Sequence, residues 1–75
     1  MAKQTIQMHG RAIEKLIYDD DTEDCIVVFV GRRGAVYYLY PDVGRDLIRD
    51  WQKAPSHGQY FHKYIKHLSS HEVFF

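Results

Sequence analysis

Short apolar runs recur along the first half of the chain, and their spacing predicts strands. In the segment from Ile13 to Tyr18, Leu16 and Tyr18 share one face of an extended backbone. The next run, residues 25–30, is apolar throughout and rich in β-branched side chains, which is typical of a central strand covered on both faces. We expect helices to cover one face; a second subunit could cover the other.

Residues 35–40 predict a third strand whose tyrosines admit two interpretations. Val36, Tyr38 and Tyr40 point to one side, and Tyr37 and Leu39 to the other. Aromatic rings on a sheet can stack nucleobases, as they do in proteins that bind single-stranded nucleic acids. Such rings more often pack beneath a helix as part of the core. The sequence leaves both interpretations open.

The turns between these strands carry opposite charges. Five acids occupy the six positions 19–24, and we expect a solvated hairpin turn there. The segment lacks the glycine and distal glutamate of a calcium-binding loop, so we assign no metal to it. The second turn, Gly31-Arg32-Arg33-Gly34, has glycines at both ends that suit a compact turn. Its arginines either serve solubility or bind a phosphate or carboxylate, which the guanidinium fork fits.

The first predicted helix follows Pro41, which ends the third strand. Asp42 is expected to cap this helix. Its apolar residues recur at helical spacing: Val43, Leu47, Ile48 and Trp51. We expect the helix to be structural and Trp51 to anchor the core.

The second predicted helix lies within residues 54–68. Pro55 should end the preceding helix at Ala54, and Ser56 and Gln59 have the spacing of a capping box. Its apolar face consists of Phe61, Tyr64, Ile65 and Leu68, and the opposite face of Gln59, His62, Lys63 and Lys66. The basic face is either simply solvated or belongs to an anion site at the helix start. The residues of that site would be Ser56, His57, Gly58, Lys63 and Lys66.

These elements predict an α+β fold: a three-stranded antiparallel β-meander followed by two C-terminal helices packed on one face. We expect residues 1–75 to form a single domain with a core at 12–68, a lead-in at 1–11 and a tail at 69–75. The tail ends in Val73, Phe74 and Phe75. The two phenylalanines either fold back over the sheet or clamp a neighbouring subunit.

Composition narrows the functional classes. The ten basic and ten acidic residues cancel, so net charge points to no partner, although the basic C-terminal half can steer a ligand. The single cysteine suits a reducing compartment, and neither a membrane-spanning run nor a signal peptide is evident, so we expect a cytoplasmic protein. Cys25 lies in a strand that we expect to be buried, and no histidine has a nucleophile at a diagnostic spacing. We therefore predict no enzymatic activity and no cofactor.

The same residues resemble the KTSC domain, a small module named for its occurrence at the C-terminus of some lysyl-tRNA synthetases. The likeness covers residues 12–68 and is most specific in Ala54-Pro55-Ser56-His57-Gly58-Gln59-Tyr60-Phe61. Other matching features are Tyr18-Asp19, Phe29, Gly34, Tyr38-Leu39-Tyr40, Val43 and Ile65. The resemblance implies a three-stranded meander with helices, which occurs alone in bacteria and phages or appended to larger proteins. It also implies a suggested role in RNA binding and supplies no catalytic residue.

Two functional hypotheses follow. The first is a nucleotide-type binder, for a short RNA or for a small nucleotide at a subunit interface. It would use Arg32, Arg33, Lys63 and Lys66 for phosphates and Tyr38 or Tyr40 for stacking. The second is a protein-interaction module, such as a phage-encoded inhibitor of a host protein, that uses the acidic turn and the tail of Val73, Phe74 and Phe75. A homo-oligomer is expected in either case, because one sheet face otherwise lacks a cover.

Overall fold

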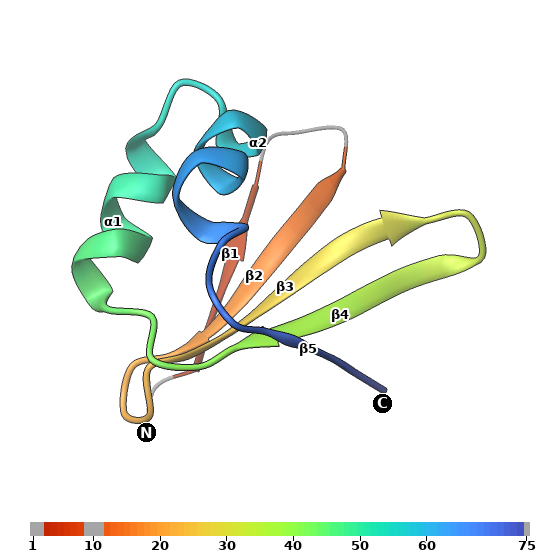
Figure 1. Ribbon diagram of the computed structural model, residues 1–75, viewed down its shortest axis with the longest axis horizontal. Helices are drawn as coiled ribbons and strands as arrows, with labels where there is room; N and C mark the ends of the chain where they lie inside the picture. Colours follow the sequence, from red (N-terminus) through yellow and green to blue (C-terminus); the bar gives the residue numbers. More distant parts are fainter. Residues whose placement is uncertain (1–2, 9–11, 75) are drawn as a thin grey trace.

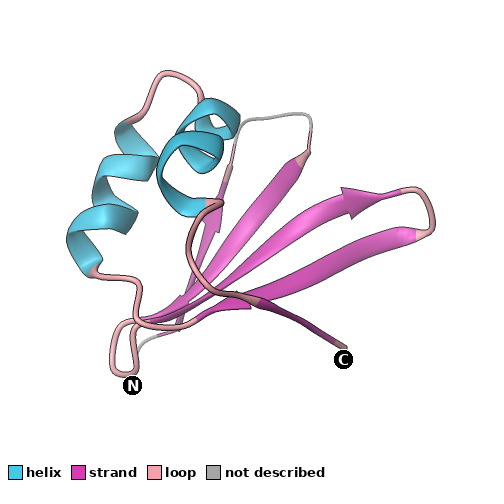
Figure 2. Cartoon of the chain, in the orientation of Figure 1, coloured by secondary structure: helices cyan, strands magenta, loops and turns pink. Residues whose placement is uncertain are grey.

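A five-stranded antiparallel sheet with helices on one face forms the fold of the computed structural model, which describes residues 3–8 and 12–74 (Figures 1 and 2). The strands lie in the sheet in chain order: β1 (Lys3–Gln7), β2 (Ile13–Asp19), β3 (Asp24–Gly31), β4 (Gly34–Tyr40) and β5 (His71–Val73). Between β4 and β5 the chain forms α1 (Arg45–Lys53), α2 (His57–Tyr60) and the π-helical turn η1 (Phe61–Ile65).

The prediction of three strands was wrong, although the α+β class was right. The three predicted strands are β2, β3 and β4; β1 comes from the expected lead-in and β5 from the expected tail. Strand β1 has one apolar residue, Ile6, which lies opposite Leu16. Strand β5 is three residues long and pairs Val73 with Tyr37. Both are edge strands held by backbone pairing, so neither has the apolar alternation that marks a strand in sequence.

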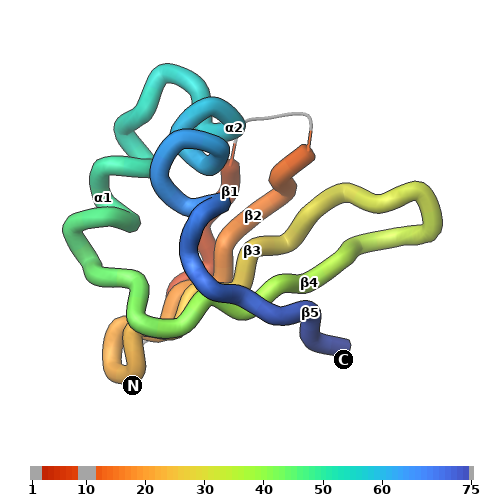
Figure 3. Tube along the Cα trace, viewed as in Figure 1, coloured from red at the N-terminus to blue at the C-terminus, as the bar shows by residue number. Residues whose placement is uncertain are grey.

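The route of the C-terminal segment explains how β5 reaches the sheet. After β4 the chain leaves the sheet, forms the three helical segments on one face and returns beside β4 (Figure 3). The tail thus extends the edge of the sheet, which the sequence did not predict. Phe75 lies outside the described residues.

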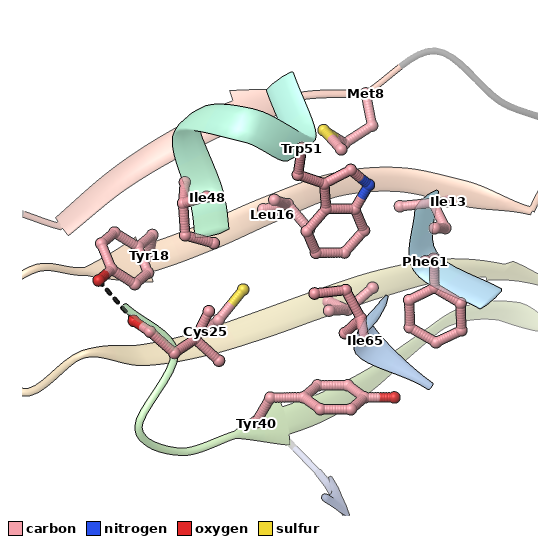
Figure 4. Packing of buried hydrophobic residues seen from close by; sticks show 12 residues of the cluster. Met8, Ile13, Leu16, Tyr18, Cys25, Tyr40, Ile48, Trp51, Phe61 and Ile65 are labelled. Carbon is pink, nitrogen blue, oxygen red and sulfur yellow. Dashed lines mark hydrogen bonds between the residues drawn. The ribbon is translucent and has the colours of Figure 1, made fainter. Parts of the chain in front are cut away.

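The core lies between the helices and the sheet face that they cover, here called the covered face (Figure 4). Leu16, Val27 and Trp51 have no exposed surface, so Trp51 is the core anchor that its helical spacing predicted. The Trp51 indole Nε1 donates a hydrogen bond of 3.0 Å to the His57 carbonyl oxygen. The Tyr18 hydroxyl donates one of 2.6 Å to the Val43 carbonyl oxygen, which ties the segment before α1 to the sheet (Figure 4).

The helix boundaries confirm one capping prediction and correct another. Ser56 precedes α2, and its hydroxyl accepts a hydrogen bond of 3.3 Å from the Gln59 amide, as the capping-box spacing predicted. Asp42 does not cap α1, whose N-cap is Gly44 and has no side-chain bond. The reason is local: Asp42 has a φ of 59°, so its backbone turns the chain three residues before α1 begins at Arg45.

Candidate functional site

An aromatic groove lies between the β3–β4 hairpin and the helical segment η1. It has a volume of about 330 Å³ and is lined by Phe29, Tyr38, Tyr40, Phe61 and Lys66. Strands β3 and β4 supply the first three side chains, all from the covered face. Three of the predicted ligand residues therefore meet in one place: Tyr38, Tyr40 and Lys66.

The rings of the groove hold one another through edge-to-face contacts. The centroid of Phe29 lies 5.7 Å from that of Tyr38 and 5.4 Å from that of Phe61. The Tyr40 and Phe61 centroids are 6.1 Å apart with perpendicular ring planes. Such pairs contribute beyond the area they bury, roughly 0.5–1.5 kcal/mol each. The groove is therefore a pre-formed apolar surface.

Tyr38 and Tyr40 have different depths in this groove. Tyr40 is 4% exposed and belongs to the core, whereas Tyr38 is half-buried and packs against it. Burial raises the pKa of the Tyr40 hydroxyl above its ordinary value, and a hydrogen bond with the Ser70 side chain acts in the opposite direction. The two interpretations of these tyrosines thus combine: Tyr40 is a core residue that forms a wall of the groove, and Tyr38 presents accessible ring surface.

The π-helical turn determines which side chain of the C-terminal helical segment joins the groove. The Lys66 amide donates a hydrogen bond of 2.8 Å to the Phe61 carbonyl oxygen, five residues back. A turn closed by this bond holds more residues than an α-helical turn, so Lys66 comes round to the side of Phe61. An α-helical pattern had placed Lys66 opposite Phe61 and Tyr64 beside it, which was wrong. Tyr64 is instead 47% exposed.

Two of the remaining predicted residues, Ser56 and Lys63, line a second, smaller hollow at the helix start. It has a volume of about 170 Å³. The Lys63 Nζ atom lies 5.4 Å from the centroid of the Tyr64 ring, within the range of a cation–π contact. Lys63 and Lys66 therefore line separate hollows, rather than one anion site.

His57 and Ser56 already have structural partners. The His57 side chain is 6% exposed, and its Nε2 donates a hydrogen bond of 3.2 Å to the Gln52 carbonyl oxygen. Gly58 has open space where a Cβ would lie, so nothing in the described fold requires a glycine there. The ligand role predicted for Ser56, His57 and Gly58 stays a prediction. In the structure His57 joins α2 to α1, and Ser56 caps α2.

The arginine turn forms the free end of the β3–β4 hairpin, far from the helices (Figure 1). Arg32 and Arg33 are exposed, as predicted, between Gly31 and the positive-φ Gly34 (φ 124°). A Cβ on Gly31 would lie 2.5 Å from the Gly34 carbonyl oxygen, so a glycine is needed at this position. Four residues of strand β4 separate the turn from Tyr38, which corresponds to about 13 Å.

A third hollow, of about 420 Å³, lies on the sheet face away from the helices, here called the outer face. The lining residues are Lys3, Ile17, Asp19, Thr22, Asp24, Ile26, Leu39, Val73 and Phe74. Of the three tail residues predicted to interact, Val73 and Phe74 thus lie beside side chains of the acidic turn. Phe74 is 84% exposed.

The chemistry-bearing groups elsewhere in the described chain show no further built site. Cys25 is 1% exposed, as its strand predicted, and burial raises the pKa of its thiol to about 12. Oxygens of Asp19, Asp20 and Asp21 lie within 4.8 Å of one another, but the Asp19 carboxylate accepts bonds from the Asp21 and Thr22 amides of its own turn. Among the described helices, none has the length and apolarity needed to cross a membrane.

Sequence reasoning missed Phe29 and Phe61 as groove residues. Both occupy positions that a pattern assigns to the core, and both do pack on it. Phe61 was assigned only to an apolar helix face and Phe29 only to a strand. Their second role depends on where the helical segment stops covering the sheet, and no local sequence signal reports that position.

Comparison with known proteins agrees with this architecture. The KTSC domain family profile matches residues 10–68. The chain is also similar to the crystal structure of a KTSC domain protein from Yersinia pestis, with 23% identity and a TM-score of 0.81. That similarity covers 97% of this chain and 100% of the other. Among curated proteins, none matches. The fold and the family match over most of the chain show that the protein belongs to the KTSC domain family.

Proposed function

We propose that this protein is a non-enzymatic cytoplasmic module that binds a nucleotide-type ligand, a short single-stranded RNA or a small nucleotide, in the aromatic groove. The observation that supports this function best is the composition of the groove. Three partly or fully buried aromatic rings lie around the half-buried Tyr38, with the exposed ammonium group of Lys66 at the margin. A base needs an aromatic surface and its phosphate needs a cation, and the groove offers both.

The distribution of cations favours a single strand over a duplex. Lys66 lines the groove, and Arg32 and Arg33 lie at the free end of the β3–β4 hairpin, which also lines it. Each phosphate contact with a nucleic acid requires its own cation, and three cations make a short footprint. A single strand can lay one base in the groove and carry its following phosphates along the hairpin toward the arginine turn.

The test is a titration of labelled oligoribonucleotides and nucleoside monophosphates, followed by fluorescence anisotropy at two salt concentrations. We expect Tyr38→Leu, which keeps an apolar side chain but removes the π face, to weaken binding about tenfold, because base stacking on an aromatic ring contributes about 1–3 kcal/mol. Lys66→Ala should weaken binding and reduce its salt dependence, since one phosphate contact is lost.

Matched variants separate the groove from the rest of the surface. Tyr37→Leu changes the neighbouring tyrosine on the opposite sheet face, and Lys53→Ala removes an exposed lysine from α1. Both should leave binding unchanged. Lys63→Ala distinguishes the groove from the hollow at the helix start, because Lys63 lines only the latter among the hollows described here. Binding that depends on Lys63 and not on Tyr38 or Lys66 would contradict the groove assignment. Failure of the protein to bind any of the probes would contradict the proposed function.

A second candidate function is supported by the outer hollow. There the acidic turn and the exposed Phe74 meet over an apolar floor, which is the combination expected of a protein-interaction module. A partner protein at this surface would leave the aromatic groove free. Its binding should survive high salt better than RNA binding and should fail when residues 72–75 are removed.

A further inference from the structure

The outer face of the sheet is apolar along its middle. Strand register places Ile17, Ile26 and Leu39 side by side in one row across three strands. All three are half-buried, since the described helices lie on the other face (Figure 2). The adjacent row contains Lys15, Val28, Tyr37 and Val73. Within the single chain Val28 is already fully buried, and the other three are half-buried. Contiguous apolar surface of this kind marks an interaction site more often than a solvated face.

The two ends of the outer face carry opposite charge. The acidic turn joins β2 to β3, and Asp19 and Asp24 lie opposite each other where it begins and ends. The arginine turn lies at the other end of β3. The eight residues of β3 separate the two turns by roughly 23 Å. The face is therefore acidic at one end, apolar in the middle and basic at the other end.

The shape of the face differs between its ends as well. The outer hollow lies at the acidic end, and Lys3 alone among its lining residues is basic. Near the basic end Val30, two residues before Arg32, is 58% exposed although it belongs to a strand. Its register partner Ala35 shows that its side chain lies on the outer face. The exposed Val30 side chain beside positive charge is therefore complementary in shape and charge to the apolar hollow beside negative charge.

We propose that a second copy of this chain covers the outer face, in a two-fold dimer whose strands run antiparallel across the interface. In that arrangement Val30 and the arginine turn of each copy lie against the acid-lined hollow of the other. Two-fold symmetry forms both contacts at once, because the same patch serves both subunits. A parallel arrangement would set acid against acid and arginine against arginine, and like charges that face each other repel.

Charge inversion tests the dimer and its orientation together. Sedimentation velocity over a wide concentration range should show a monomer–dimer equilibrium for the natural chain, weaker at high salt. The Arg32→Glu/Arg33→Glu variant and the Asp21→Lys/Asp24→Lys variant should each raise the dimer dissociation constant about tenfold or more, because each makes both contacts repulsive. An equimolar mixture of the two variants should recover the dimer, since each mixed contact pairs opposite charges again.

Two controls complete the experiment. Arg49→Glu/Lys53→Glu makes the same change of charge on the exposed surface of α1 and should leave the dissociation constant unchanged. Circular dichroism of each variant checks that the fold is kept; Val30→Asp, at an exposed side chain, provides a second disruptive change. A chain that stays monomeric at every concentration overturns the proposal. A dimer that tolerates both charge inversions, or a mixture that does not recover it, overturns it as well.

Discussion

The two faces of the sheet are both apolar, yet the chain closes only one of them with helices. On the covered face Leu16, Cys25 and Val27 are at most 1% exposed beneath Trp51. On the outer face Ile17 and Ile26, one residue further along the same strands, keep part of their surface. The difference between the faces comes from the helices that follow β4. Apolar composition therefore shows that a face needs a cover, but it does not show whether the cover belongs to the same chain.

The largest expected effect comes from the centre of the covered face. Trp51→Ala removes a fully buried ring and its hydrogen bond to the His57 carbonyl. We expect the free energy of unfolding to fall by about 3–5 kcal/mol in urea titrations, which is a large part of the stability of a small domain.

The matched variant on the outer face is Ile26→Ala. It should be measured in the Arg32→Glu/Arg33→Glu background, where we expect the chain to be monomeric. The loss of stability should be less than half of that for Trp51→Ala, because Ile26 is half-buried and leaves a smaller cavity. Equal losses would show that the outer face is closed within a single chain.

The next expected effect is a pH dependence of stability that comes from the Cys25 thiol on the covered face. Burial raises its pKa from the ordinary 9.0 to about 12. Between these values the folded chain keeps a proton that the unfolded chain releases, so stability is full below pH 9 and falls as pH rises. The free energy of unfolding should fall by up to about 1.4 kcal/mol per pH unit in this range. Cys25→Ala should make the fall shallower.

The control moves the thiol to the outer face. Cys25→Ala/Val30→Cys presents a thiol at a position where the natural side chain is 58% exposed in the single chain. At a protein concentration low enough for the monomer, it should bring back no dependence on pH in this range. Urea titrations should be compared just above pH 9, because burial also raises the pKa of Tyr18, Tyr40 and Tyr60 above the ordinary 10.0 of tyrosine. A free energy of unfolding of the natural chain that changes little with pH above 9 would contradict the burial of Cys25.

Local signals in the sequence predicted the parts of the fold that depend on near neighbours. The cap at Ser56 and the glycine turn around Arg32 and Arg33 are formed by residues within a few positions of each other. Trp51 was predictable because helical spacing alone marks the buried side of α1. These features need no information about distant segments.

The missing strands and the composition of the groove depend on distant segments. Strand β5 exists because the chain returns to β4 after three helical segments, and its three residues carry no pattern of their own. The π-turn at Phe61 changes which side chains share a face, so an α-helical pattern misplaced Lys66 and Tyr64. Tyr38, Tyr40 and Lys66 were named from their types, but their meeting with Phe29 and Phe61 follows from this tertiary arrangement.

The smallest expected effect on monomer stability comes from substitutions of exposed side chains on the outer face and in the tail. Val30→Thr keeps a β-branched residue in the strand, and Phe74→Ser changes a side chain that is 84% exposed. Each should alter the stability of the monomer by no more than about 0.5 kcal/mol. Both side chains lie where we place the second copy, so each variant should weaken the dimer.

Urea titrations at low and high protein concentration distinguish these two effects. Association with a second folded chain adds apparent stability that grows with protein concentration. The natural chain should therefore unfold at higher urea when concentrated, and the Val30→Thr and Phe74→Ser variants should lose most of that increase while matching the natural chain when dilute. If the variants keep the increase, the second copy lies elsewhere; if they lose stability when dilute, Val30 and Phe74 belong to the core of one chain.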